Sequence, residues 1–334
     1  MKTIGCFLIL VAGWATGSTA LAQPVLDDPR ATWTLLVEND SFTREDDNYT
    51  SGAQIGYVSG TKPLAGFSAF LANTLVRPQG DAVTRRGFTL THAFYTPDNL
   101  RPAGPQPGEH PWAGVFTAET VWMVQQSRRL DRFSVEVGLI GPSALAEPIQ
   151  KAVHSITGDV EPQGWNNQID DEFLLNFHYN VQKRFLREAS LFGKPFDMII
   201  SGVVSAGNKY TGLGGGSTLR WGPGVTSTFS TPRVRTAING GPSFFTERMS
   251  PTWHVYMGGD VRAVAHNIVL DDSFFRDENI ADVSSEVIVS DFEIGAVVQI
   301  GKYQGAISAT ARSPQFEEES EIQAFAALSL SRKF

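Results

Sequence analysis

Cysteine is nearly absent from this sequence: the chain has 334 residues and a single cysteine, Cys6. That residue lies in an N-terminal segment with a basic start, an apolar run and an Ala-Leu-Ala cleavage site at 20–22, the features of a secretory signal. We therefore expect residues 1–22 to be removed and residues 23–334 to form the mature domain. A mature chain without cysteine has no disulfides, no cysteine-based zinc site and no thiol nucleophile.

Long apolar runs and basic clusters are also missing from residues 23–334. The whole chain has a net charge of −8 and no basic block, which argues against nucleic acid as a partner. No linker rich in proline, glycine and serine divides the chain, so we expect one domain. Outside residues 1–22, no run of about 18 apolar residues could cross a membrane as a helix. A closed β-barrel is the other structure that can cross a bilayer.

What the sequence does contain is repeated alternation of apolar and polar residues. From 175 to 182 the apolar side chains occupy odd positions with polar ones between them, and 252–268 shows a similar pattern. This two-residue period is typical of strands whose two faces meet different environments. We predict about twelve strands, an even number that permits antiparallel closure. They lie near 31–40, 50–60, 85–96, 113–127, 130–141, 172–184, 195–206, 216–229, 252–268, 285–301, 303–313 and 321–334.

The polar face of these strands is unusual for a soluble sandwich, because it is rich in histidine, asparagine, aspartate and arginine. His178, His254 and His266 fall on it, and we interpret them as hydrogen-bonded residues of a polar barrel interior. The last run is amphipathic and ends in Phe334, like the C-terminal assembly signal of bacterial outer-membrane proteins. The predicted fold is therefore an all-β, antiparallel transmembrane barrel in a bacterial outer membrane.

Two segments depart from the strand pattern. Residues 143–157 repeat apolar residues at spacings of three and four, which predicts a helix with His154 on its polar face. Spacing alone leaves two interpretations of His154 open, a solvated histidine and a catalytic one. Residues 63–77 are apolar without strict alternation, and we interpret them as a short helix or a loop.

An acidic, carbonyl-rich turn joins the first two predicted strands. Asn39 and Asp40 stand at its start and Thr50 at its end. An Asn-Asp pair before a turn is common turn chemistry. The same two side chains also carry hard oxygen ligands of the kind that Ca²⁺ takes, and a threonine hydroxyl can add a hydrogen bond. This turn and His154 are the two candidate halves of an active site.

Short motifs spread from about residue 33 to the C-terminus resemble those of the lipid A deacylase family of Gram-negative outer membranes. In chain order they are Asn39-Asp40, Tyr49-Thr50-Ser51-Gly52, Tyr95-Thr96-Pro97, Pro111-Trp112-Ala113-Gly114, Gly138-Leu139-Ile140-Gly141-Pro142-Ser143, His154 with Gly158, Gly164-Trp165-Asn166-Asn167-Gln168 and Asn267-Ile268-Val269-Leu270-Asp271. Enzymes of this family remove the 3′-linked acyloxyacyl group from lipopolysaccharide. The resemblance implies a twelve-stranded barrel, and it implies lipid A and outer-membrane lipids as partners.

Carried to this chain, the resemblance implies a calcium-assisted ester hydrolase. Asn39, Asp40 and Thr50 match active-site positions near a Ca²⁺ ion, and His154 matches the histidine proposed as general base. A neutral imidazole can take a proton from water as it attacks an ester. Calcium can stabilise the oxyanion that develops, in place of the backbone donors of a serine hydrolase.

Two positions depart from the family pattern. Val160 stands where the family has an acid, and we expect the adjacent Glu161 to serve as a metal ligand instead. The family lysine beyond the Tyr-Thr-Pro motif is missing, and Arg101, one position out of step, is the expected substrate-binding cation. An arginine also binds phosphate or an oxyanion, as a planar fork in place of a point charge.

Two alternative functions remain open at this point. Val160 favours a non-enzymatic barrel, a porin-like channel or scaffold that kept the fold and lost the chemistry. An outer-membrane phospholipase shares the barrel type and the use of calcium, but the Asn/His/Ser motifs of that class are not found in the sequence.

Overall fold

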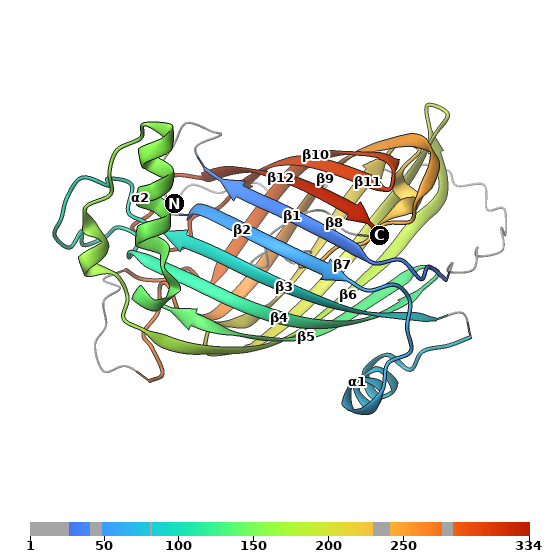
Figure 1. Cartoon of the computed structure of the whole chain (residues 1–334), viewed down its shortest axis with the longest axis horizontal. Coiled ribbons are helices and arrows are strands. Elements are labelled where there is room, and N and C mark those ends of the chain that lie inside the picture. The colour runs from blue at the N-terminus through green and yellow to red at the C-terminus, as the bar shows by residue number, and fades with distance from the viewer. Residues whose placement is uncertain (1–26, 41–48, 81, 230–240, 276–282) are drawn as a thin grey trace.

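The computed structural model describes residues 27–40, 49–80, 82–229, 241–275 and 283–334. Within them, twelve antiparallel strands form a closed barrel, in which chain neighbours pair and β1 pairs with β12 (Figure 1). Closure leaves no free sheet edge, which a strand wall in a bilayer requires. The predicted barrel is confirmed. The expected signal segment, 1–22, lies outside the described residues.

The strands correspond one to one with the predicted runs. They are β1 (Thr32–Asn39), β2 (Tyr49–Val58), β3 (Val83–Tyr95), β4 (Ala113–Gln126), β5 (Arg129–Ile140), β6 (Glu172–Leu191), β7 (Lys194–Gly207), β8 (Tyr210–Trp221), β9 (Arg248–Asn267), β10 (Ile288–Gly301), β11 (Tyr303–Arg312) and β12 (Gln323–Lys333). For β8 the predicted range, 216–229, was displaced toward the C-terminus from the observed strand, Tyr210–Trp221. The first half of this strand is rich in glycine, which favours a loop by local propensity, but ladders to β7 and β9 hold it extended.

The wall has an apolar outer face and a polar inner face. Along β1, Trp33 and Leu35 are 46% and 51% exposed, whereas Thr34 between them is buried. The three histidines that we predicted to face inward, His178, His254 and His266, are all buried. The outer face is therefore the surface that meets lipid, and the inner face is the polar one.

Charged side chains inside the barrel are paired across strands. Arg220 on β8 donates to both carboxylate oxygens of Asp197 on β7, at 2.8 and 2.6 Å. His178 on β6 lies 3.1 Å from a carboxylate oxygen of Glu136 on β5. Buried charges need such partners, because their removal from water is otherwise very costly.

Apolar clusters fill the interior at both ends of the barrel. One cluster is built from the strand ends near α2 and from three loops: Ala93, Tyr95, Ala113, Val115, Ile140, Ile169, Leu174, Ile268, Val269, Leu270, Phe316 and Phe325. The other, at the opposite end, consists of Val58, Val121, Met123, Leu130, Ile199, Phe229 and Phe244. The interior is a packed core with a polar middle layer.

Helices occupy the connections between strands. They are α1 (Gly66–Leu71), the π-helical turn η2 (Ala72–Val76), η3 (Pro142–Ala144), α2 (Ala146–Thr157), η4 (Gly164–Asn167) and η5 (Val225–Ser227). The predicted helix at 143–157 corresponds to α2 preceded by η3, and the segment 63–77 contains α1 and η2. Figure 1 shows α1 and α2 at opposite ends of the barrel. In the part of the chain that the structure describes, no helix is long and apolar enough to cross a membrane.

Candidate functional site at the α2 end of the barrel

The predicted site residues all belong to one end of the barrel. Asn39 ends β1, Thr50 stands at the start of β2, and α2 carries His154 across the same end (Figure 1). Arg101 lies in the connection from β3 to β4, and Glu161 follows α2 in the connection from β5 to β6. Antiparallel order alone places these residues at one end, because successive connections lie at alternate ends of the barrel.

Asn39 and Asp40 differ in burial. Asn39 continues the outward-facing odd positions of β1 and is partly exposed, beside Ser51 on β2. Asp40 is only 1% exposed. The turn that follows, 41–48, lies outside the described residues, and so does the side chain of Thr50. An amide oxygen and a carboxylate at adjacent positions match the donor chemistry of Ca²⁺.

The helix α2 packs on the outside of the barrel wall, against β3 and β4. A side chain at Gly114, on the outer face of β4, would place its Cβ 2.6 Å from the Cβ of Ala146, so only glycine permits this close approach. His92, on the outer face of β3, donates from Nε2 to the carbonyl of Ala144 at 2.8 Å. Both contacts fix the start of the helix on the wall.

One stripe of α2 faces the barrel: Ala146 and Gln150 are buried and His154 is half-buried. Eight residues of helix span about 12 Å, and strands lie about 4.8 Å apart. Because η3 contacts β5 and β4 while α2 contacts β4 and β3, the helix runs in the direction of β2 and β1. His154, near the end of the helix, therefore lies toward β1, the strand that ends at Asn39.

The imidazole of His154 has one hydrogen-bond partner that defines its tautomer. Its Nδ1 lies 2.6 Å from the backbone carbonyl oxygen of Val160. A carbonyl oxygen only accepts, so Nδ1 carries the proton and Nε2 of the neutral ring is left as an acceptor. The position that departs from the family pattern therefore orients the histidine through its backbone, whatever its side chain.

Trp165 fastens the segment after α2 back onto the helix. Its Nε1 donates to the side-chain oxygen of Gln150 at 2.8 Å, and its ring meets that of Trp112 edge to face at 5.0 Å. A Cβ at Gly164 would lie 2.4 Å from the Nε1 of Trp112, so this turn also depends on glycine. Trp165 therefore has a structural role, because it holds the segment that follows α2 against the helix.

Arg101 and Glu161 are exposed side chains at this end. The backbone N–H of Arg101 donates to the side-chain oxygen of Asn99 at 3.1 Å. The hydrogen bond with Glu147 raises the pKa of Lys151 on α2, and the charge of Glu161 adds a smaller effect in the same direction. Among the described residues, no three histidine or acidic side chains gather into a metal-binding group. The calcium site with Glu161 as a ligand remains a prediction.

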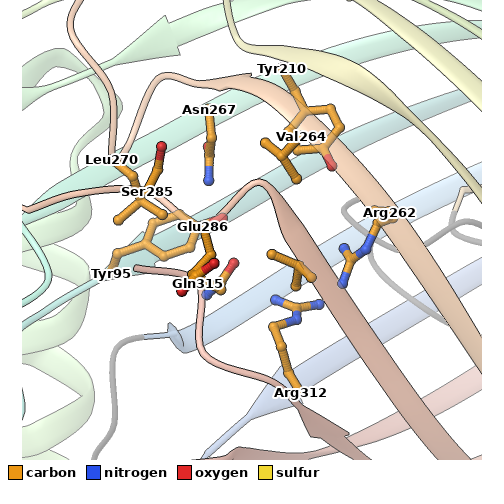
Figure 2. Close-up of a pocket in the computed structure, with 11 residues that line it drawn as sticks. Tyr95, Tyr210, Arg262, Val264, Asn267, Leu270, Ser285, Glu286, Arg312 and Gln315 are labelled. Atoms are coloured by element: carbon orange, nitrogen blue, oxygen red, sulfur yellow. The ribbon is translucent and has the colours of Figure 1, made fainter. Parts of the chain in front are cut away.

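A small cavity lies inside the barrel below this end. Figure 2 shows Tyr95, Tyr210, Arg262 and Arg312 around it. Its volume is about 30 Å³, the share of one water molecule in the liquid. A sugar or an acyl chain does not fit, so the outer rim beside α2 is the candidate site.

Two residues of this site were missed by our sequence analysis. His92 falls in an alternating strand on the same face as Phe88 and Phe94, and that parity could have identified it as a histidine on the outer wall. The contact of Gln150 with Trp165 has no sequence signal beyond the helical spacing, because it depends on how the following loop folds back.

These features define the class of protein: a closed transmembrane-type β-barrel with a helix, α2, packed on its outer wall at one rim. The model of the family described as outer membrane protein LpxR matches residues 4–334. The chain belongs to this family and is an outer-membrane protein, which confirms the predicted resemblance and localisation.

The same fold is found in a solved structure. LpxR from Salmonella typhimurium matches with a TM-score of 0.74 at 17% sequence identity, over 91% of this chain and 100% of that chain. The beta domain of the Bordetella autotransporter BrkA has a TM-score of 0.44 at 9% identity, over 92% of this chain and 99% of that chain. A search of the curated proteins gives no match.

The two ends of the barrel can now be assigned to the two sides of the membrane. Connections at the α2 end include the long segments 96–112 and 141–171, and 208–209 is a short one. At the opposite end 127–128, 192–193 and 302 are tight turns, although the longer connections 59–82 and 222–247 also lie there. Outer-membrane barrels have their longer loops outside the cell and short turns in the periplasm. We therefore assign the α2 end to the outward-facing side.

Proposed function

We propose that the protein is an esterase that removes the 3′-linked acyloxyacyl group of lipid A. The observation that carries this proposal is the hydrogen bond from His154 Nδ1 to the Val160 carbonyl at 2.6 Å, which leaves Nε2 as a base. In the proposed reaction Nε2 takes a proton from water, and the water oxygen attacks the ester carbonyl. When the ester bond breaks, the sugar oxygen takes up that proton and the acyloxyacyl acid leaves.

The outer wall supports this choice of substrate. Below Asn39 on β1 and β2, Val37, Leu35 and Ile55 face outward and are exposed. Acyl chains of lipid A in the outward-facing leaflet would lie along this apolar wall, while the ester and sugar sit at the rim. Arg101 would contact a phosphate group of the sugar, because an arginine fork matches phosphate geometry.

Asn39 and Asp40 are the residues that would hold Ca²⁺, with Glu161 and Thr50 as further oxygen groups in the proposal. When bound, the cation would polarise the ester carbonyl and stabilise its developing negative charge. The residues of the chain would supply hard oxygen ligands at the rim and an imidazole with its proton on Nδ1.

Purified protein incubated with lipid A and Ca²⁺ tests the proposal by mass spectrometry of the product. We expect loss of one acyloxyacyl group, abolished by a calcium chelator and reduced about 10²- to 10⁴-fold in His154→Ala. Val160→Ala is the matched control and should retain activity, because the carbonyl that orients His154 belongs to the backbone. Undiminished product from His154→Ala would reject the general-base role.

The alternative of a non-enzymatic barrel rests on Val160 in place of the family acid. Its channel form is disfavoured by the apolar clusters that fill both ends of the interior. Its scaffold form predicts no chelator-sensitive product from the wild type in the same assay.

A further inference from the structure

The segment 62–78 leaves the barrel at the periplasmic end and folds against its outer wall. The helix α1 and the turn η2 belong to it, and Figure 1 shows α1 outside the barrel outline at the end opposite α2. Ser68, Ala72 and Val76 are the buried residues of this helical stretch. Their spacing of four residues places them on one face, turned to the barrel.

The wall beneath this segment is the lipid-facing side. Ala72 and Val76 form a cluster with Val124 and Phe133, and Trp122 and Tyr179 pack against it. Register pairs Trp122 with Phe133 and Phe133 with Tyr179, so the three aromatic rings form one row across β4, β5 and β6. Such rows mark the level where the bilayer core meets the headgroups.

Large apolar side chains cover the opposite side of the segment. Phe67 and Phe70 are 65% and 61% exposed, and their rings stack at a centroid distance of 6.4 Å. Leu75 is exposed as well. Soluble proteins rarely expose large contiguous apolar patches. A helix that lies in a membrane interface does expose such a patch, with its apolar side chains among the acyl chains.

The charge of the segment contrasts with the rest of the chain. Lys62 and Arg77 flank α1 and η2, and no acidic residue occurs between 62 and 80, although the chain as a whole has a net charge of −8. Basic residues near a membrane surface favour anionic lipids. A hollow of about 500 Å³ beside the helix is lined by Lys62, by apolar residues such as Leu64 and Ala72, and by Asp27 from outside the segment. Its size is within the range of small-ligand sites.

We infer that residues 62–78 form a phospholipid-binding foot that lies in the periplasmic leaflet of the membrane. Phe67 and Phe70 insert among the acyl chains, and Lys62 and Arg77 meet the phosphates of the headgroups. The continuity of the segment with the outer wall at the aromatic row selects a lipid surface as the partner over a second protein. This foot lies at the end opposite α2 and contributes nothing to the site at the outward-facing rim.

Site-specific labelling of the full barrel in vesicles tests the inference. The sequence after residue 22 has no cysteine, so Phe70→Cys in the mature barrel can carry a single environment-sensitive fluorophore. In vesicles that contain phosphatidylglycerol, we expect severalfold stronger quenching by a doxyl-labelled lipid than for the matched control Gln79→Cys, and weaker quenching by iodide. If label at position 70 impairs folding, judged by heat-modifiable migration on gels, Phe67→Cys replaces it.

A second experiment tests the contact of Lys62 and Arg77 with the lipid headgroups. Lys62→Gln combined with Arg77→Gln should reduce lipid quenching at position 70 in phosphatidylglycerol vesicles and change nothing in pure phosphatidylcholine. Iodide quenching at position 70 equal to that of the Gln79→Cys control would overturn the inference. Quenching by neither agent, with a signal that depends on protein concentration, would replace the lipid by a second copy of the chain.

Discussion

The protein carries two helical segments on its outer wall, and they are attached by different forces. The helix α2 is positioned by specific polar contacts, His92 to the Ala144 carbonyl and Trp165 to Gln150, and by the close approach at Gly114. The α1 segment is attached mainly by burial of apolar groups on the row of aromatic side chains. Hydrogen bonds and close contacts define one orientation, whereas apolar burial is non-directional. The helix that bears the candidate general base is therefore held by directional contacts, whereas those of the segment 62–78 include the hydrogen bonds of the Lys62 backbone with Thr84, where the segment leaves the barrel.

Gly114→Val should show the difference between the two segments most clearly, because it displaces α2 alone. Its side chain would collide with Ala146, whose Cβ lies 2.6 Å from the position of a Cβ at residue 114. We expect α2 to shift from the wall and deacylase kcat/KM to fall about 100-fold, since a displacement near 1 Å has that effect on a reacting geometry. The control is Gly202→Val on the outer face of β7, where the nearest atom is 3.8 Å away. Equal activity of the two variants would contradict the proposed role of α2.

A double-mutant cycle on Trp165 and Gln150 measures the directional contact itself. Trp165→Phe or Gln150→Leu leaves one buried partner without its hydrogen bond, which costs about 1–3 kcal/mol. We expect each single variant to expose α2 to proteolysis and to lower activity about tenfold. The double variant should lose less than the sum of the two single losses, because it removes both polar groups. Additive losses would show that the contact does not couple helix and loop.

Acid should loosen the outward-facing rim through His110 in the connection 96–112. Burial lowers the pKa of His110 to about 4, against a smaller opposing effect of its hydrogen bond with the Pro111 carbonyl. In the unfolded chain its pKa is about 6.5. The unfolded segment therefore binds a proton first, so the contribution to stability is complete above about pH 6.5 and is lost between pH 6.5 and about 4.

Cleavage after Glu109 by a glutamate-specific protease at neutral and acidic pH checks this prediction. The His110 ring stacks on Tyr95 at 5.1 Å, and His110→Phe keeps an aromatic ring there without a titrating group. We expect acid to raise the cleavage rate of the wild type and to leave His110→Phe nearly unchanged. The same acid response in both proteins would assign the effect to other groups.

The barrel could be predicted from sequence because each strand meets lipid on one face and a polar interior on the other, so alternation recurs twelve times. The site was predicted through motifs shared with the family, and its geometry was not. The apolar residues of α2, among them Ile149 and Ile156, are exposed, and the stripe with Gln150 and His154 faces the wall. The usual rule that apolar helix faces turn inward assumes water outside. At the rim of a membrane barrel the surroundings are partly lipid, so the orientation was decided by Gly114 and Trp165.

The smallest effect on activity is expected from the α1 segment. Val76→Asp places a carboxylate against the apolar wall at Phe133 and should detach the segment, because burying an unpaired charge is very unfavourable. We expect the fluorescence of a label at position 70 to change while deacylase activity in detergent stays within about twofold, because α1 and α2 lie at opposite ends of the barrel. A loss of activity as large as that of Gly114→Val would mean that the strands transmit displacement from one end of the barrel to the other. In that case the outer wall between α1 and α2 would act as one rigid unit, and the division into an attached foot and a positioned site would fail.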